Sequence, residues 1–264
     1  MIDLHCHILP GIDDGAPDLA TALAMARIAV ADGIEVTACT PHIYPGLYEN
    51  NAAGIRVAIR ALQTALDENG IPLKLVEGAD VHLTPDLLVD LRADRIPTIN
   101  ATRYLLLEPP HHVAPPRFEE QVFNLLANGY VPLITHPERL TWIEMHYPMF
   151  LRIAKGGAWL QITAGALTGR FGARPKYWSE RLLEEGPVQI IATDAHSVHR
   201  RPPVLSEARI AAEKRVGTEE SWALVRDRPA AILKNLRADK ARPAVVPDSP
   251  RAPPGFWKRL LSRS

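Results

Sequence analysis

Residues 1–16 read MIDLHCHILPGIDDGA and set two histidines one residue apart in an apolar run, followed by two carboxylates at a turn. The apolar start predicts a short strand. Because alternate side chains of a strand share a face, Asp3, His5 and His7 are expected to point one way. Cys6 is then directed to the opposite face. One face of this strand therefore carries three groups able to bind a metal ion, and the rest of the chain must decide whether they do.

Size and composition favour one main domain with no attraction for nucleic acid. The chain has 264 residues, of which 47% are hydrophobic, and this is enough for a large core. Thirty basic residues balance thirty acidic ones, so the whole-chain field does not steer the protein toward polyanions. The two cysteines, Cys6 and Cys39, are too few for a disulfide framework and are expected to be buried, unreactive thiols.

The two ends of the chain suggest where the protein works. The start lacks a charged segment followed by a long apolar stretch, and no apolar run reaches about 18 residues, so we expect a cytoplasmic protein. From about residue 240 the chain becomes proline-rich and ends in GFWKRLLSRS. We therefore divide it into a domain at 1–238 and a tail at 239–264. The tail is either disordered or a basic amphipathic element that docks on a partner or on the inner face of the membrane.

Strand-like and helix-like patterns alternate about seven times. Helical patterns cover residues 18–33, 52–70, 118–129 and 206–216. This alternation implies parallel strands with crossover helices, either as an open sheet or as a closed barrel. No GxGxxG motif follows the first strand, so a dinucleotide-binding sheet has no support. The predicted strands are residues 1–5, 34–40, 73–79, 103–108, 130–136, 158–163 and 188–194.

Polar residues at the ends of these strands favour the barrel. They lie at or just after the carboxyl ends of six predicted strands, which is the rim where parallel barrels carry their sites. Imidazole and carboxylate without thiolate suit a cluster of divalent ions such as Mn, Fe or Zn. Without cations, so many buried carboxylates would repel one another at a cost of several kcal/mol. The residues are His5, His7, His42, Asp80, Glu108, His136, Asp194 and His196.

Two or three such ions favour hydrolysis of a phosphoester. They lower the pKa of a bridging water and stabilise the attacking and leaving oxygens of an in-line displacement at phosphorus. Arg139 and Arg201 follow two of the histidine motifs, and guanidinium groups suit bidentate capture of phosphate oxygens. For each of these arginines the alternative is a plain surface charge.

Taken together, the motifs resemble the polymerase-and-histidinol-phosphatase (PHP) superfamily over residues 1 to about 235. Within it, the sequence is similar to the bacterial metal-dependent protein tyrosine phosphatases of capsule and exopolysaccharide synthesis. The resemblance implies an α/β fold, a distorted (βα)7 barrel of the TIM-barrel-like PHP type. The motifs are HCH at 5–7, IDDG at 12–15, TPH at 40–42, Glu108, THPER at 135–139, LQITAGALTGRFG at 160–172 and TDAH at 193–196.

The same resemblance implies a manganese-type centre of two or three ions, with iron or zinc as alternatives. Its substrate would be the tyrosine-rich tail of a bacterial kinase, attacked by a hydroxide that bridges the ions. Arg139 and Arg201 would contact the phosphate and, with Glu108, form the catalytic set. The implied metal ligands are His5, His7, Asp14, His42, Asp80, Glu108, His136, Asp194 and His196.

Two positions depart from the family pattern, and two other functions stay open. Asp80 stands where glutamate is usual, and Thr163 where asparagine is typical. A small-molecule phosphatase of the histidinol-phosphate type is the first alternative, and a non-catalytic metal-binding scaffold is the second. A cysteine nucleophile has no support, because position 12, six residues after Cys6, is isoleucine rather than the arginine that a cysteine-dependent phosphate loop needs.

Overall fold

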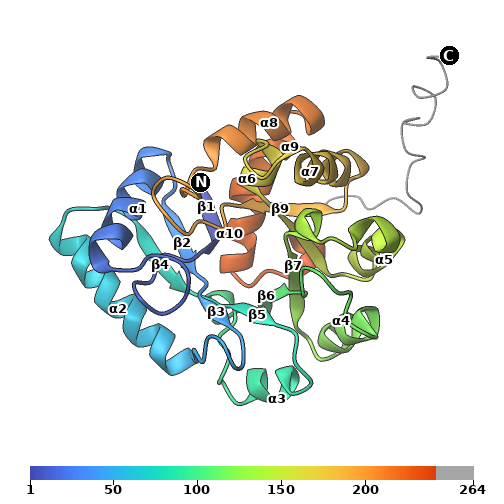
Figure 1. Ribbon diagram of the computed structural model, residues 1–264, viewed down its shortest axis with the longest axis horizontal. Coiled ribbons are helices and arrows are strands. Elements are labelled where there is room, and N and C mark those ends of the chain that lie inside the picture. The colour runs from blue at the N-terminus through green and yellow to red at the C-terminus, as the bar shows by residue number, and fades with distance from the viewer. Residues whose placement is uncertain (242–264) are drawn as a thin grey trace.

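Parallel strands surround the centre of the molecule, and helices cover them from outside (Figure 1). The computed structural model describes residues 1–241, and every hydrogen-bonded pair of strands in this part of the chain is parallel. The predicted tail thus falls outside the described residues, apart from residues 239–241. The strands are β1 (Ile2–Cys6), β2 (Val36–Cys39), β3 (His42–Ile43), β4 (Lys74–Glu77), β5 (Asp80–His82), β6 (Tyr104–Glu108), β7 (Val131–Thr135), β8 (Trp159–Thr163) and β9 (Val188–Ala192).

The nine strands between residues 1 and 241 occupy seven strand positions in the wall of a barrel, and we call each position a stave. Only Thr40 and Pro41 separate β2 from β3, and only Gly78 and Ala79 separate β4 from β5, so each pair is one interrupted stave. The hydrogen-bonded order is β1-β2-β4 in one sheet and β3-β5-β6-β7-β8-β9 in the other. Backbone bonds from the end of β1 to residues 194 and 195, just after β9, close the ring. The predicted distorted (βα)7 barrel is confirmed.

The four helices predicted from the sequence are present with nearly the predicted bounds. Asp18 caps the first of them by accepting a hydrogen bond from the Thr21 amide at 2.8 Å. No helix among the described residues is both long and apolar enough to cross a bilayer. The helices are α1 (Leu19–Ala31), α2 (Ala52–Glu68), α3 (Leu87–Arg92), α4 (Phe118–Ala127), α5 (Ile143–Lys155), α6 (Ala164–Leu167), α7 (Ala173–Glu185), α8 (Ser206–Val216), α9 (Thr218–Trp222), a π-helical turn (Ala223–Asp227) and α10 (Arg228–Leu233).

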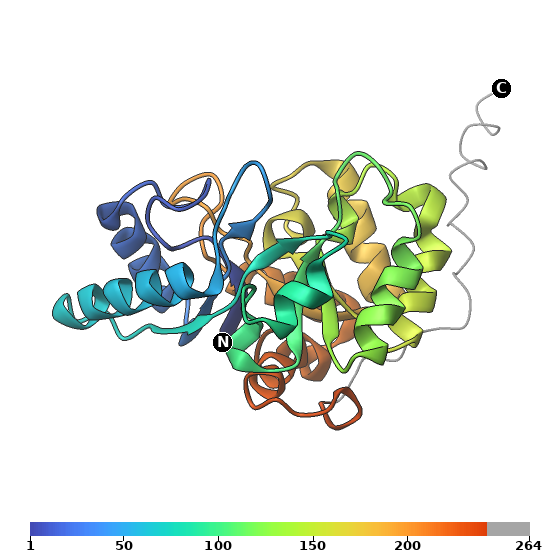
Figure 2. The same ribbon diagram turned by 90° about the horizontal axis from the view of Figure 1, so that it is seen from below.

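The apolar core has two parts. The larger fills the space between the strands and the surrounding helices. The smaller, which we call the inner cluster, contains Leu106, Leu133, Trp159 and Ile190 from four strands together with Ile232 of α10. Figure 2 shows the red C-terminal helices at the lower edge of the barrel, opposite the loops that follow the strands. One end of the barrel is thus closed by apolar packing, and the other end remains for the site.

Strict alternation along β1, expected from the sequence, is wrong at one point. Leu4 belongs to the inner cluster, whereas Cys6, two residues later, packs in the larger core. The pairing of β1 with β2 shifts register between Asp3 and Cys6, and this irregularity changes which face each side chain takes. The Oδ1 atom of Asp3 accepts hydrogen bonds from the Thr193 amide at 2.9 Å and from the His5 amide at 3.3 Å, so its carboxylate is used by the backbone. It helps to join β1 to β9 and belongs to no candidate metal group.

Candidate metal centre

The carboxyl ends of the strands bring the predicted ligand residues to one place. Strand register sets His42 directly beside Asp80, and His82 directly beside Glu108. Asp80 itself opens the short strand β5 after the break at Gly78, rather than following the end of a longer strand. Because the stave is interrupted before β5, the carboxylate of Asp80 can reach the site although Asp80 is part of the barrel wall.

Eight of the nine predicted ligand residues fall into four overlapping groups. Within each group, the ligand atoms lie within 4.8 Å of one another. Asp194, the ninth, places Oδ1 at 3.3 Å from His5 Nε2 and 3.5 Å from His7 Nε2. The sequence-predicted residues therefore form one cluster. The groups are His7, Asp14, His42 and His196; His5, His7 and Asp80; Glu108, His111 and His136; and His42, Asp80 and Glu108.

Several buried atoms of this cluster fit bound cations. Neither carboxylate oxygen of Asp80 has a hydrogen-bond partner meeting the usual geometry within the described residues, and the same holds for Nδ1 of His42 and His136. Leaving a buried charged oxygen unpaired costs at least a few kcal/mol. Divalent cations would satisfy these oxygens and nitrogens, and the donor set of imidazoles and carboxylates suits Mn, Fe or Zn.

The carboxylate of Glu108 lies among four imidazoles. Its Oε2 is 2.8 Å from Nε2 of His82 and 3.4 Å from Nδ1 of His42. Its Oε1 is 3.3 Å from Nε2 of His111 and 3.5 Å from Nε2 of His136. Burial alone would raise the pKa of Glu108, but hydrogen bonds from His111 and His82 outweigh it and hold the pKa well below its usual value. Glu108 is therefore a permanent negative charge at the centre.

Neighbouring carboxylates raise the pKa values of the first two histidines. Burial tends to lower the pKa of His7, but bonds to Asp13 and Asp194 outweigh burial and raise it to about 10. The pKa of His5 is also raised, because the charges of Asp194 and Asp80 exceed the effect of burial. Their Nε2 atoms lie only 3.2 Å apart. A shared proton or a cation is needed between them.

The remaining two buried histidines are neutral and ready to donate a lone pair. Burial, reinforced by Arg139, sets the pKa of His136 well below its usual value. Burial, reinforced by the neighbouring His7, lowers the pKa of His196 to about 4. A neutral imidazole is the form that binds a metal ion.

Two residues of the cluster have strained backbones. His136 has φ 35° and Asp194 has φ 51°, in the left-handed region that residues with a side chain seldom adopt. Each such residue costs roughly 1–2 kcal/mol. Strain of this kind persists where the surrounding structure demands it, and it concentrates at functional sites.

The turn at residues 11–16 folds back over His7. Asp13 accepts a hydrogen bond from His7, with Oδ2 2.7 Å from Nδ1, and its other oxygen accepts from the Gly15 amide at 2.9 Å. Asp14 reaches outward, half exposed, with Oδ1 3.4 Å from His196 Nε2. A Cβ on Gly15 would lie 2.1 Å from the His7 carbonyl oxygen. Only glycine permits this approach.

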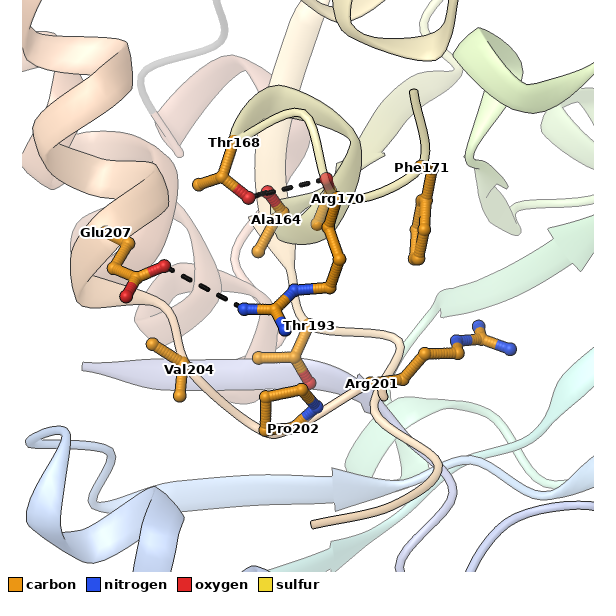
Figure 3. Close-up of a pocket in the computed structure, with 10 residues that line it drawn as sticks. Ala164, Thr168, Arg170, Phe171, Thr193, Arg201, Pro202, Val204 and Glu207 are labelled. Carbon is orange, nitrogen blue, oxygen red and sulfur yellow. Dashed lines mark hydrogen bonds and ion pairs between the residues drawn. The ribbon is translucent and has the colours of Figure 1, made fainter. Parts of the chain in front are cut away.

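Arg139 and Arg201 lie beside the cluster and share one carboxylate oxygen. Both guanidinium groups contact Oδ2 of Asp194, Arg139 through Nη1 at 2.6 Å and Arg201 through Nη2. The ring of Phe171 lies against both, with centroid distances of 5.1 Å to Arg139 and 5.8 Å to Arg201. Figure 3 shows Phe171 and Arg201 at the same side of the pocket. About a fifth of each arginine side chain is exposed, so both can meet a ligand from solvent.

Five neighbours of the cluster escaped sequence analysis: Asp13, His82, His111, Gln161 and Phe171. Gln161 brings in β8, the one stave without a predicted site residue, since its Oε1 lies 2.8 Å from His5 Nδ1. His82 had a readable signal, because DVH at 80–82 repeats the spacing of HCH at 5–7. Asp13 and Phe171 stand inside the IDDG and LQITAGALTGRFG motifs, but nothing in those motifs marked them as site residues.

Substitution of Gly15 by alanine tests the turn over His7. The added methyl group cannot fit against the His7 carbonyl, so the turn must move away and withdraw Asp13 and Asp14. We expect a loss of metal content by elemental analysis and a destabilisation of about 1–3 kcal/mol in thermal unfolding. Gly54→Ala in α2, where the nearest atom lies 3.7 Å away, is the matched control and should change neither. Full metal content in Gly15→Ala would contradict this role.

Proton release on metal binding tests the charge state of His7. Because the pKa of His7 is raised to about 10, the metal-free protein holds a proton there at pH 7. A cation must displace it, so we expect release of about one proton. Calorimetry in buffers of different ionisation enthalpy measures this number, and His7→Gln should reduce it. Binding without proton release at pH 7 would refute the assignment.

Comparison with known proteins supports a metal-dependent phosphatase. A family model described as capsular polysaccharide synthesis, CpsB/CapC, matches residues 1–234. The chain is 39% identical over 248 residues to tyrosine-protein phosphatase YwqE of Bacillus subtilis, covering 93% of this chain and 96% of YwqE. It is 27% identical over 238 residues to tyrosine-protein phosphatase CpsB of Streptococcus pneumoniae, covering 88% and 98%.

A solved structure extends this likeness to the fold. It comes from the crystal structures of YwqE from Bacillus subtilis and CpsB from Streptococcus pneumoniae, described as unique metal-dependent tyrosine phosphatases. It superimposes with a TM-score of 0.86 at 35% identity, covering 96% of this chain and 99% of the other. The resemblance inferred from the sequence motifs is confirmed.

Proposed function

The chain belongs to the CpsB/CapC family of capsular polysaccharide synthesis, and we propose that it is a metal-dependent tyrosine-protein phosphatase that hydrolyses phosphotyrosine on a protein substrate. The observation that carries this function is the pair of buried carboxylates, Asp80 and Glu108, amid histidines, with two arginines beside them. Carboxylates, imidazoles and guanidinium groups in one place are what phosphoester hydrolysis on a metal cluster needs.

We propose two or three divalent ions per chain, with Mn²⁺ as the native metal and Fe or Zn as the alternatives that availability selects. The four overlapping groups of side chains supply their ligands. When bound, such ions lower the pKa of a coordinated water toward neutrality and neutralise charge on the phosphate. Asp80 is one methylene shorter than the usual glutamate, and it compensates by entering from β5, where its Oδ2 lies 3.4 Å from His5 Nε2.

The arginines would bind and orient the phosphate. In the absence of substrate, Asp194 holds both guanidinium groups at one oxygen, which keeps them convergent. A phosphate dianion offers stronger bidentate partners than one shared carboxylate oxygen, so each arginine can turn part of its hydrogen bonding to the substrate. Phe171 limits where they can move. Gly165 makes room for this ring, since a Cβ there would lie 3.0 Å from Phe171 Cζ.

A tyrosine phosphoester is suited to this site. The phenolate leaving group has a conjugate-acid pKa near 10, so it departs with less general-acid help than an alkoxide needs. The mouth of the cluster also reaches solvent, since Asp14 is half exposed, and this suits a peptide substrate better than an enclosed pocket would. A small-molecule phosphatase of the histidinol-phosphate type is therefore not favoured. The hydrolytic residues likewise disfavour a metal-binding scaffold.

We propose that the substrate is the tyrosine-rich tail of a bacterial kinase that controls capsule or exopolysaccharide synthesis. The family description supports a role in capsule synthesis, and the name of the CpsB relative supports a phosphotyrosine substrate. We place the phosphatase in the cytoplasm, at the inner face of the membrane. Residues 239–264 are then the segment proposed to contact membrane or partner, separate from the phosphatase domain at 1–238.

Removing one buried ligand candidate tests the metal mechanism. His136→Ala deletes an imidazole that lies 3.5 Å from Glu108, and we expect turnover of a phosphotyrosine peptide to fall by about a hundredfold or more. Elemental analysis of protein purified without added metal should give two or three ions for the wild type and fewer for the variant. His146→Ala in α5 is the matched control and should retain both properties. Unchanged turnover in His136→Ala would remove this mechanism.

Replacing Phe171 tests whether its ring positions the arginines. Phe171→Leu keeps apolar bulk but loses the cation–π contacts, each about 0.5–1 kcal/mol. We expect KM for the phosphotyrosine peptide to rise about three- to tenfold with unchanged metal content, while Phe171→Tyr stays close to wild type. Steady-state kinetics measures the split between KM and kcat. An equal loss in both variants would show that packing, rather than the aromatic face, is required.

A further inference from the structure

A small hairpin beside the metal centre has no role in the function described so far. Residues 44–48 follow β3 directly, and two backbone bonds close them, Tyr44 N to Tyr48 O at 3.0 Å and Tyr48 N to Tyr44 O at 2.8 Å. Gly46, with φ +82°, forms the tight turn between them. In Figure 2 the blue loop after β3 rises at the same edge as the other loops that follow strands. The hairpin thus stands at the rim that carries the centre.

Both tyrosine rings of the hairpin stack on imidazoles of the centre. The ring of Tyr44 lies 3.7 Å from that of His82 at an interplanar angle of 15°. The ring of Tyr48 lies 5.6 Å from that of His42, also at 15°. His82 in turn contacts Glu108 at 2.8 Å. One layer of side chains therefore separates the tyrosine rings from the buried carboxylates.

The exposed part of Tyr44 is an open aromatic surface. Tyr44 is 40% exposed as a residue, and His82 covers one face of its ring, so its exposed atoms lie away from that face. Leu47 at the turn is 62% exposed. The Tyr44 hydroxyl makes no hydrogen bond within residues 1–241, so its position does not depend on the phenol oxygen. Large apolar side chains in contact with such a charged centre indicate a surface that binds something.

We propose that the hairpin at 44–48 recognises the phenyl ring of the substrate. The ring of a phosphotyrosine would meet the exposed edge of the Tyr44 ring while its phosphate lies at the metal centre, and Leu47 would contact the neighbouring peptide residue. Aromatic rings prefer such offset or edge-to-face pairs, and a pair of this kind adds about three- to tenfold in affinity beyond burial. This inference rests on the proposed function, and it names the element that selects aryl over alkyl phosphoesters.

The contrary interpretation is that Tyr44 only supports His82 and, through it, Glu108. The two roles differ in what they affect. A supporting role would weaken every phosphate ligand equally, whereas recognition of the phenyl ring affects only ligands that carry a ring. The ratio of affinities for two ligands with and without a ring therefore separates them, and this ratio does not depend on how much metal a variant holds.

The experiment compares phenylphosphonate with methylphosphonate, which cannot be hydrolysed, in calorimetric titrations of the metal-loaded protein. Tyr44→Leu keeps an apolar side chain but removes the ring, and Tyr44→Phe keeps the ring without the hydroxyl. Tyr177→Leu is the matched control, because Tyr177 in α7 is 41% exposed and packs on Trp178 rather than on the centre. Elemental analysis reports the metal content of each variant.

We expect Tyr44→Leu to weaken phenylphosphonate binding about three- to tenfold and leave methylphosphonate binding unchanged. Tyr44→Phe and Tyr177→Leu should keep the wild-type ratio. An equal loss for both ligands in Tyr44→Leu, or no loss for either, would overturn the inference. Hydrolysis of a phosphotyrosine peptide by the wild type tests the proposed function separately, so an unchanged affinity ratio in Tyr44→Leu with that activity intact overturns the inference alone.

Discussion

Mutual repulsion among buried carboxylates is the constraint on which the rest of the structure depends. Asp80, Glu108 and Asp194 are nearly inaccessible to solvent, and they lie within a few ångström of the same histidines. Such an arrangement is unfavourable until cations or protons neutralise it. The strained backbones at His136 and Asp194 add to the local cost. The site is therefore an unstable region that the remainder of the barrel has to hold in place.

The barrel does so by placing its apolar packing at one end of its axis and the site at the other end. Inner-cluster residues such as Trp159 and Leu106 fill the lower part, and α10 closes it from beneath. Tyr104 ties this closure to the wall, donating from its hydroxyl to the Leu236 carbonyl at 2.7 Å. At the opposite rim, loops supply Asp13, Arg201 and Phe171. Loops can change without disturbing the packed end, which is how barrels of this kind acquire different specificities.

The strands, and a set of polar residues that come together at one rim, were predictable from the sequence for a simple physical reason. Buried parallel strands are continuous apolar runs, so a histidine or carboxylate at the end of such a run is conspicuous, as with Glu108 after YLLL or Asp194 after IIAT. Prediction from the sequence failed where a residue acts through a neighbour. Gln161 lies within an apolar run, and Asp13 looks no different from Asp14. The register shift after Asp3 has no signal in residue types.

The breaks within the staves were equally hidden. Residues 34–40 and 73–79 read as whole strands, yet Pro41 has no amide hydrogen to donate to a sheet, and Gly78 sits where a Cβ would lie 3.0 Å from Thr40 Cγ2. These two positions adjoin, so the interruptions occur side by side. That local opening of the wall is what admits His42 and Asp80 into the centre, and it accounts for much of the distortion of the barrel.

The closing seam between β1 and β9 has a consequence for how the chain folds. Residues 5 and 7 bond to residues 194 and 195, so the ring shuts only when segments nearly 190 positions apart meet. Contacts of such long range are slow to form, because the entropy of loop closure must be overcome before they bring any gain. His5 and Asp194 flank this seam at 3.3 Å. A cation bound between them would link the first strand to the last after the other strands have assembled.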